Sequence, residues 1–226
     1  MRGSYGIVFV LVLLSFLVQA SAPDGDFTRL VIIWLQGATL VFAVRIARAD
    51  HRPVRLAAGV ALLVGIAAPI LWLVHGSIPD SVAAIATGLL VAVAPPVIAA
   101  GLVRDLRADA QVTVETLSGV LSIYLLAGMF FSFAFAAVGA IGDEPFFAQV
   151  ADPGRSDYLY FSYTTLTTTG FGDFTAATDL GRTLAVVEAL VGQIYLVTIV
   201  ALIVTNLRPR RRADSKAPAP SSGDDG

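Results

Sequence analysis

The sequence Thr167-Thr168-Thr169-Gly170-Phe171-Gly172-Asp173 decides the fold that we expect for this chain. It follows a polar and aromatic segment, residues 157–166, that is too short to span a bilayer, and long apolar runs lie on both sides. Irregular backbone at membrane depth is tolerated only where protein buries it or where it lines a water-filled cavity. The stretch therefore predicts the wall of a pore.

Gly170 and Gly172 stand at alternate positions of this stretch, where a row of carbonyls aimed at one axis requires them. An ordinary strand points successive carbonyls to opposite sides. Aiming them one way needs alternating dihedral signs, and glycine adopts positive φ at little cost. Such carbonyls can replace the hydration shell of a cation, and the Thr168 hydroxyl can add a further ring of oxygens. One chain supplies one carbonyl per ring, so several copies must surround the axis.

The stretch resembles the selectivity filter of the potassium-channel pore family, which reads Thr-x-Gly-(Tyr/Phe)-Gly-Asp. Tyr160-Phe161-Ser162 is similar to the aromatic cuff on the family's pore helix, and Gly181-Arg182 falls at family spacing in the inner helix. The resemblance implies a homotetramer that conducts K⁺ passively and is not an enzyme. It implies K⁺ binding along the filter by Thr168, Thr169, Gly170, Phe171 and Gly172.

The resemblance also implies roles for residues around the filter. The expected supports of the filter are Tyr160, Ser162, Asp173 and Glu188. The expected gating hinge is Gly192, and the residues expected to line the cavity and the inner gate are Gln193, Leu196, Val200 and Val204.

The composition is that of a membrane protein with several spans, because the 226 residues are 56% hydrophobic, 14% charged and have a mean hydropathy of +0.78. The net charge of −2 argues against nucleic acid as a partner. The chain has no cysteine, which excludes disulfides and thiolate chemistry. We expect no cofactor, with K⁺ only as the permeant ion, and the lipid bilayer as a partner.

Six apolar runs predict an all-α membrane protein with a re-entrant pore helix and the filter between the fifth and sixth spans. The expected spans are residues 5–20, 28–47, 54–75, 81–103, 113–140 and 182–207. They divide the chain into a four-helix domain (1–112), a pore domain (113–207) and a basic, disordered cytoplasmic tail (208–226). Residues 1–22 also fit a secretory signal peptide; we expect them to be retained as a helix.

Positive charges predict the orientation in the cell membrane. Only three of the fifteen basic residues, Arg29, Arg155 and Arg182, fall in the outer segments when both termini are cytoplasmic. The fourth span has no charged residue between Ser81 and Val103, which argues against an arginine-based voltage sensor. Its Pro95-Pro96 pair predicts a kink or a division of the helix. Residues 104–109 are interpreted as a solvated connector along the inner membrane surface.

Glu188 lies about two turns inside the last span, where a carboxyl group needs a partner or must be neutral. We expect it to hydrogen-bond to the back of the pore helix through Ser162, Tyr163 or Thr165; the alternative is a pH-sensitive acid in the cavity.

The chain departs from the family at the second filter position, where Thr169 replaces Val or Ile. Tyr160 and Phe161 replace tryptophans, and Thr164 stands where some members have an acid; a Tyr160–Asp173 hydrogen bond is expected to substitute. Thr169 keeps a non-selective cation channel open as an alternative. A cation symporter and a non-conducting membrane subunit are the alternatives from other classes.

Overall fold

The computed structural model describes residues 5–23, 25–47, 80–108, 113–142 and 144–206, together with residues 59, 63, 64, 66, 67, 69, 70, 72–74 and 76. Its regular elements are helices, with a single isolated β-bridge in this part of the chain. The helices are α1 (Tyr5–Ser21), α2 (Asp26–Ala47), α4 (Asp80–Ala108), α5 (Val114–Ile141), α6 (Arg155–Leu166) and α7 (Asp179–Asn206). The expected tail, 208–226, lies outside the described residues, and so does most of the expected third span, 54–75.

Four of the described helices are long and apolar enough to cross a membrane. They comprise Asp26–Ile46, Thr87–Asp105, Val114–Ile141 and Asp179–Leu202, and α1 is a shorter apolar helix. The expectation of an all-helical membrane protein is therefore confirmed. The count of six spans and the retention of residues 1–22 stay predictions.

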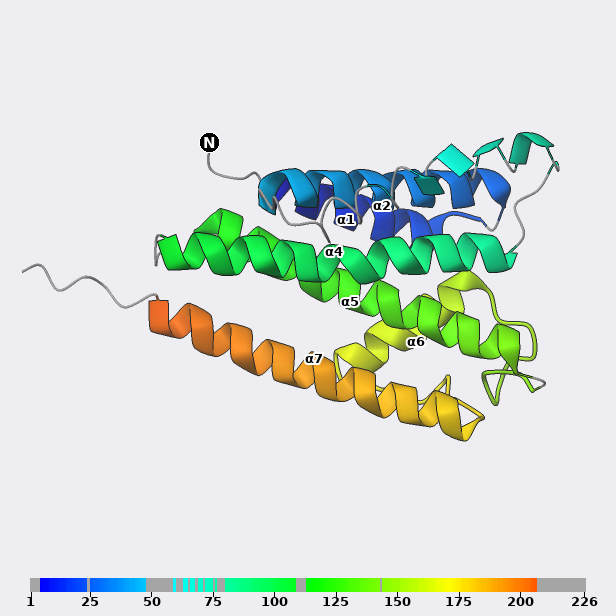
Figure 1. Ribbon diagram of the computed structural model, residues 1–226. Helices are drawn as coiled ribbons and strands as arrows, with labels where there is room; N and C mark the ends of the chain where they lie inside the picture. Colours follow the sequence, from blue (N-terminus) through cyan, green and yellow to red (C-terminus); the bar gives the residue numbers. More distant parts are fainter. Residues whose placement is uncertain are drawn as a thin grey trace, which may run out of the picture.

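Helices α1, α2, α4 and α5 run side by side (Figure 1). Helix α7 contacts α5, and the short α6 packs against both of them. The main core lies among the first four of these helices and is mostly aliphatic. Helix α1 enters it through Tyr5, Val8 and Val12, whose spacing of three and four residues forms one helical face. The start of α1 and the end of α7 lie at the same end of the bundle.

Helix α4 corrects two expectations from the sequence. It continues from Asp80 to Ala108 with Pro95 and Pro96 inside it, so the proline pair does not divide the span. Each proline removes a backbone hydrogen bond, but the flanking residues Val91, Ala94, Val97 and Ile98 are buried in the core, and this packing holds the helix together. Residues 104–108 form its last turn rather than a solvated loop; Asp109 lies outside the described residues.

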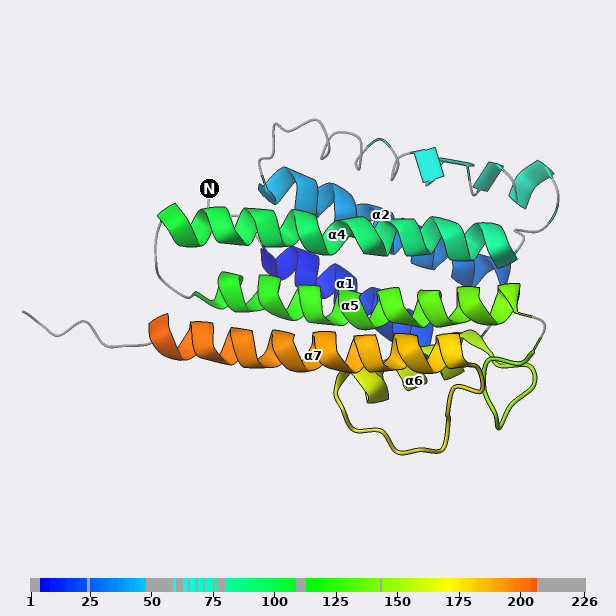
Figure 2. The same ribbon diagram turned by 60° about the horizontal axis from the view of Figure 1, so that its bottom comes forward.

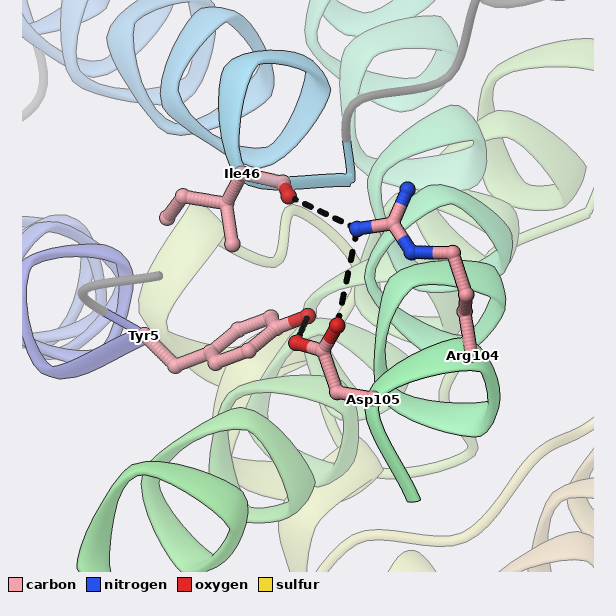
Figure 3. Close-up of polar contacts among 4 residues, drawn as sticks. All are labelled: Tyr5, Ile46, Arg104 and Asp105. Carbon is pink, nitrogen blue, oxygen red and sulfur yellow. Dashed lines mark hydrogen bonds and ion pairs between the residues drawn. The ribbon is translucent and has the colours of Figure 1, made fainter. Parts of the chain in front are cut away.

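Polar contacts tie helix ends together at the end of the bundle where α1 begins, and Figure 3 shows those among α1, α2 and α4. Arg104 donates to the carbonyl of Ile46 at 3.4 Å and pairs with Asp105 at 3.5 Å, while the Tyr5 hydroxyl donates to the other Asp105 oxygen at 3.1 Å. Beside them, the Gly6 N–H donates to Glu115 at 3.1 Å. Together these contacts join the starts of α1 and α5 to the ends of α2 and α4.

A second, aromatic core lies at the opposite end of the bundle, where α5 ends and α6 begins. It is made of residues from α5, α6 and the loop between them, with Ala176 from the segment before α7. Its buried members are Phe131, Phe135, Phe146, Phe147, Tyr158, Phe161 and Ala176. This core fixes α6 against α5.

Candidate functional site

The segment that follows α6 leaves the helix through a tight turn. At the start of α6, Asp157 accepts the Gly154 N–H at 2.9 Å. At its end, the Thr164 carbonyl accepts the N–H groups of both Thr169 and Gly170, at 2.9 and 3.0 Å. This shared acceptor satisfies one of the carbonyls that a helix C-terminus leaves without a partner, and it anchors the inner end of residues 167–173, which we call the filter segment.

The backbone of the filter segment alternates in handedness. Thr168, Gly170 and Gly172 have φ values of 56°, 52° and 79°. The sequence pointed to the two glycines but not to Thr168, because a threonine rarely adopts positive φ and pays about 1–2 kcal/mol for it. An alternation of this kind is what a row of carbonyls on one side of a ribbon requires.

The filter segment projects away from the helices of its own chain (Figure 2). Every residue from Thr167 to Asp173 is exposed, and the Phe171 side chain is 69% exposed. The segment starts at the end of α6, about halfway along the bundle, and returns to the end of the bundle at which α6 and α7 both begin. Its polar atoms therefore face a space that this chain alone does not enclose.

Tyr160 holds the outer end of the filter segment. Its hydroxyl donates to Asp173 at 2.7 Å, and its ring stacks on that of Phe171 at 6.3 Å with an interplanar angle of 8°. The hydrogen bond to Asp173 raises the pKa of Tyr160 above its ordinary value. The structure thus contains the contact that the sequence suggested in place of the family's tryptophan.

Glu188 and Ser162 meet behind the filter segment, and both are fully buried. The Ser162 hydroxyl lies 2.5 Å from one oxygen of Glu188 and 2.7 Å from the carbonyl of Gly128. The contact joins α7 to α6 and α5 at one point. Among the described residues, the second oxygen of Glu188 has no hydrogen-bond partner. Of the three partners suggested by the sequence, the structure has Ser162.

Three tyrosine hydroxyls join the helices around the site, and the sequence analysis missed this role. Tyr124 of α5 donates to the Leu166 carbonyl at 3.2 Å, and Tyr163 of α6 donates to the Leu125 carbonyl at 2.6 Å. Tyr195 of α7 donates to the Val120 carbonyl at 2.5 Å. The available signal was the presence of tyrosines inside or beside apolar runs, since a buried hydroxyl usually finds a partner.

Gly128 and Gly192 allow the three helices to approach one another. A Cβ on Gly128 would lie 2.7 Å from the Tyr163 ring. A Cβ on Gly192 would overlap the Leu166 carbonyl oxygen, at the end of α6. Gly192 thus has a packing reason to be glycine. Helix α7 is continuous through it, and its role as a gating hinge stays a prediction.

The remaining predicted residues of α7 lie on an uncovered face. Gln193, Leu196 and Val200 are exposed in the single chain; the side chain of Val204 lies outside the described residues. Only 11% of the apolar window of α7 is buried, against 39–44% in the other three candidate spans. This helix has far fewer neighbours in its own chain than an ordinary bundle helix.

Comparison with known proteins assigns the part of the chain that contains this site. Residues 119–208, which contain most of α5 and all of α6, the filter segment and α7, match the family model described as "Ion channel". These residues carry an ion-channel domain. A stretch of 46 residues is 56% identical to "Probable potassium channel protein 2" of Methanocaldococcus jannaschii. That alignment covers 19% of this chain and 13% of the relative, so the chain spans only a small part of that protein.

Both matches support the potassium-channel pore family, and the resemblance seen in the sequence is confirmed for this ion-channel domain. The roles of individual residues stay predictions. Among the described residues, no group of three or more acidic, histidine or cysteine side chains is placed to hold a metal ion. The filter segment offers a cation its backbone carbonyls, its threonine hydroxyls and the carboxylate of Asp173.

Proposed function

We propose that the chain forms a homotetrameric, potassium-selective channel that conducts K⁺ passively across the cell membrane. The observation that carries this proposal is the alternating positive φ at Thr168, Gly170 and Gly172 in a segment fixed at both ends. Four such ribbons around an axis replace the water of a dehydrated K⁺ by rings of carbonyl oxygens. The Thr168 hydroxyl adds a ring at the inner end.

The tetramer is supported by the surfaces that the single chain leaves open. The filter segment is exposed, and the apolar α7 lies largely uncovered. Exposed apolar surface of this extent marks a contact with lipid or protein. In the proposed assembly, one side of α7 lines the cavity through Gln193, Leu196 and Val200, and the apolar side chains between them meet neighbouring chains.

The orientation follows from the charges and the helix order. Both termini are proposed to be cytoplasmic, which places Asp173 and the start of α7 outside. Between Ser81 and Val103, α4 carries no charged residue, so the channel is proposed to lack an arginine-rich voltage sensor. The function is transport without chemistry, so the protein is not an enzyme and needs no cofactor.

The test is ion flux from the purified chain in liposomes, with K⁺ and Na⁺ gradients compared. We expect K⁺ flux to exceed Na⁺ flux, and we expect Gly170→Ala to abolish K⁺ flux. A Cβ at φ +52° is strained, whatever space surrounds it. Full K⁺ flux in that variant would refute the assignment of the filter.

A non-selective cation channel is the second candidate. Thr169 favours it, because its hydroxyl replaces the branched apolar side chain of the family, and it lies 2.8 Å from the Thr167 hydroxyl instead of packing into the chain. Equal K⁺ and Na⁺ flux in the same assay would establish this alternative.

A further inference from the structure

The loop between α5 and α6 forms a short antiparallel pair with the chain that leaves the filter segment. Phe147 and Ala176 form the β-bridge. On one side of it the Ala148 N–H donates to the Thr175 carbonyl at 3.0 Å, and on the other the Ala177 N–H donates to the Phe146 carbonyl at 2.8 Å. A pairing this short is weak by itself, because two-stranded ribbons are marginal in water.

The side chain of Gln149 extends this pairing by one further rung. Its Oε1 accepts the Thr175 N–H at 2.9 Å, and its Nε2 donates to the Thr175 hydroxyl at 2.8 Å. With the bond from Ala148, the N–H, carbonyl and hydroxyl of Thr175 are all bonded to the same loop. The carboxamide therefore does for Thr175 what a peptide group of a longer strand would do.

The loop that carries Gln149 is itself fixed to α6. Phe147 is buried, and its ring lies 5.2 Å from the rings of both Tyr158 and Phe161 and 5.0 Å from that of Phe174. Aromatic pairs at these distances stabilise a core beyond their buried area. A displacement of Thr175 relative to α6 must therefore break its hydrogen bonds to Ala148 and Gln149 or disrupt the buried aromatic core, and the hydrogen bonds are the weaker of the two.

Thr175 is the second residue after Asp173, so its position sets the outer end of the filter segment. The inner end is anchored at the Thr164 carbonyl, and the outer end is held by the Tyr160–Asp173 bond and by this loop. The residues between these anchors are exposed, and the contact that α6 makes with them is the stacking of Tyr160 on Phe171. The positions of their carbonyls therefore depend mainly on the two anchors.

We propose that Gln149 is a positioning residue of the filter, which holds Thr175 and thereby keeps the outermost carbonyls in register for ion binding. The inference rests on the proposed function, because it assigns the filter segment to ion conduction. Gln149 touches no ion; it acts through Thr175.

The test uses the full chain in liposomes and in detergent, with two readouts. Hydrogen exchange of the Thr175 amide reports the anchor, whether or not the protein conducts. Sustained K⁺ flux, at low and high external K⁺, reports the consequence. Gln149→Leu keeps the approximate size and removes both polar groups. Gln149→Glu keeps an acceptor for the Thr175 N–H, and the Thr175 hydroxyl can turn to donate to it. Thr175→Ser is the matched control, because it keeps the N–H and the hydroxyl.

We expect Gln149→Leu to raise the rate of hydrogen exchange at the Thr175 amide about tenfold and to lower sustained K⁺ flux about tenfold. Tenfold is the change in an equilibrium constant that corresponds to the loss of two exposed hydrogen bonds of ordinary strength. High external K⁺ should restore the flux, because ions bound among the carbonyls stabilise the ordered filter. A variant that had only lost its fold would not recover. Gln149→Glu and Thr175→Ser should behave as the unaltered protein.

Unchanged exchange and flux in Gln149→Leu would overturn the proposal, and so would a loss that high K⁺ does not reverse. If Gln149→Leu fails to assemble, Thr175→Val replaces it, since it removes only the hydroxyl contact. A Thr175→Val protein that matches Thr175→Ser in both readouts would also refute the proposal. If the unaltered protein passes no K⁺, the proposed function fails, and the exchange comparison still decides whether Gln149 holds Thr175.

Discussion

Substitution of Gly192 by alanine tests the geometry of the site most directly. The added Cβ would overlap the carbonyl oxygen of Leu166 and lie 3.0 Å from its carbonyl carbon. Both atoms belong to the backbone at the end of α6, immediately before the filter segment. No side-chain rotation can relieve the overlap, so α7 and α6 must separate. The hydrogen bond between Ser162 of α6 and Glu188 of α7 resists that separation.

The expected loss can be bounded from these contacts. Overpacking of a closely packed interface costs about 1–3 kcal/mol, and an overlap with backbone belongs to the upper part of this range. Replacing glycine by alanine within a helix stabilises the folded state by about 0.5–1 kcal/mol, which offsets part of this loss. We therefore expect Gly192→Ala to lower the free energy of unfolding by about 2 kcal/mol. The displaced end of α6 should also reduce K⁺ flux.

The assay is denaturant titration of the purified protein in detergent, followed by circular dichroism, together with liposome flux. Gly37→Ala is the matched control, because that residue also lies in an apolar helix but has no atom within 4 Å of an added Cβ. We expect the control to be slightly stabilised. Gly128→Ala provides a contrast, since its overlap is with the Tyr163 ring and should be relieved by a second change, Tyr163→Leu. A Gly192→Ala protein with the stability and flux of Gly37→Ala would refute the reasoning.

Two further predictions concern the contacts on either side of the filter. A double-mutant cycle of Ser162→Ala and Glu188→Ala should give a coupling energy of about 0.6 kcal/mol, the average for hydrogen bonds between membrane helices, and at most about 1.7 kcal/mol. Additive losses in denaturant titration would show that the two groups do not interact. Tyr160→Phe should lower sustained K⁺ flux at every pH below the raised pKa of Tyr160, because it removes the hydrogen bond to Asp173. In the unaltered protein, only the neutral phenol of Tyr160 can donate this bond, and the pKa of that phenol is raised above its ordinary value of about 10. The bond therefore persists below pH ~10. It is lost as the pH rises through the raised pKa. A flux that fell between pH 7 and 9 through this group would contradict the assignment.

Much of the site could be predicted because its chemistry is local in the sequence. The alternate glycines of the filter segment show which backbone positions need positive φ, and the structure has it at both. The carboxyl of Glu188 stood alone in an apolar span, so it needed a partner, and a hydroxyl on the preceding helix was within reach. The positive φ of Thr168 was not predicted, because threonine itself does not favour it and the residue lies in the turn after α6.

The rest depended on how the helices face each other. The hydroxyls of Tyr124 and Tyr195 donate to backbone carbonyls of another helix. Every residue has such a carbonyl, so the sequence does not show which one is the acceptor. The pairing of residues 146–149 with 175–177 is too short to leave a periodic pattern. Pro95 and Pro96 were expected to kink or divide α4, as they would in an isolated helix; the helix is not divided, because the surrounding core packs against the residues that flank the prolines.

Both ends of the filter segment are fastened within one polypeptide, and this bears on how an assembly of four would arise. The ribbon takes its shape while each subunit folds, so the conformational entropy of ordering it is lost at that stage and not when subunits meet. In the proposed tetramer, subunit association would then join prearranged parts, and a complete ring of oxygens would form when the fourth subunit docks.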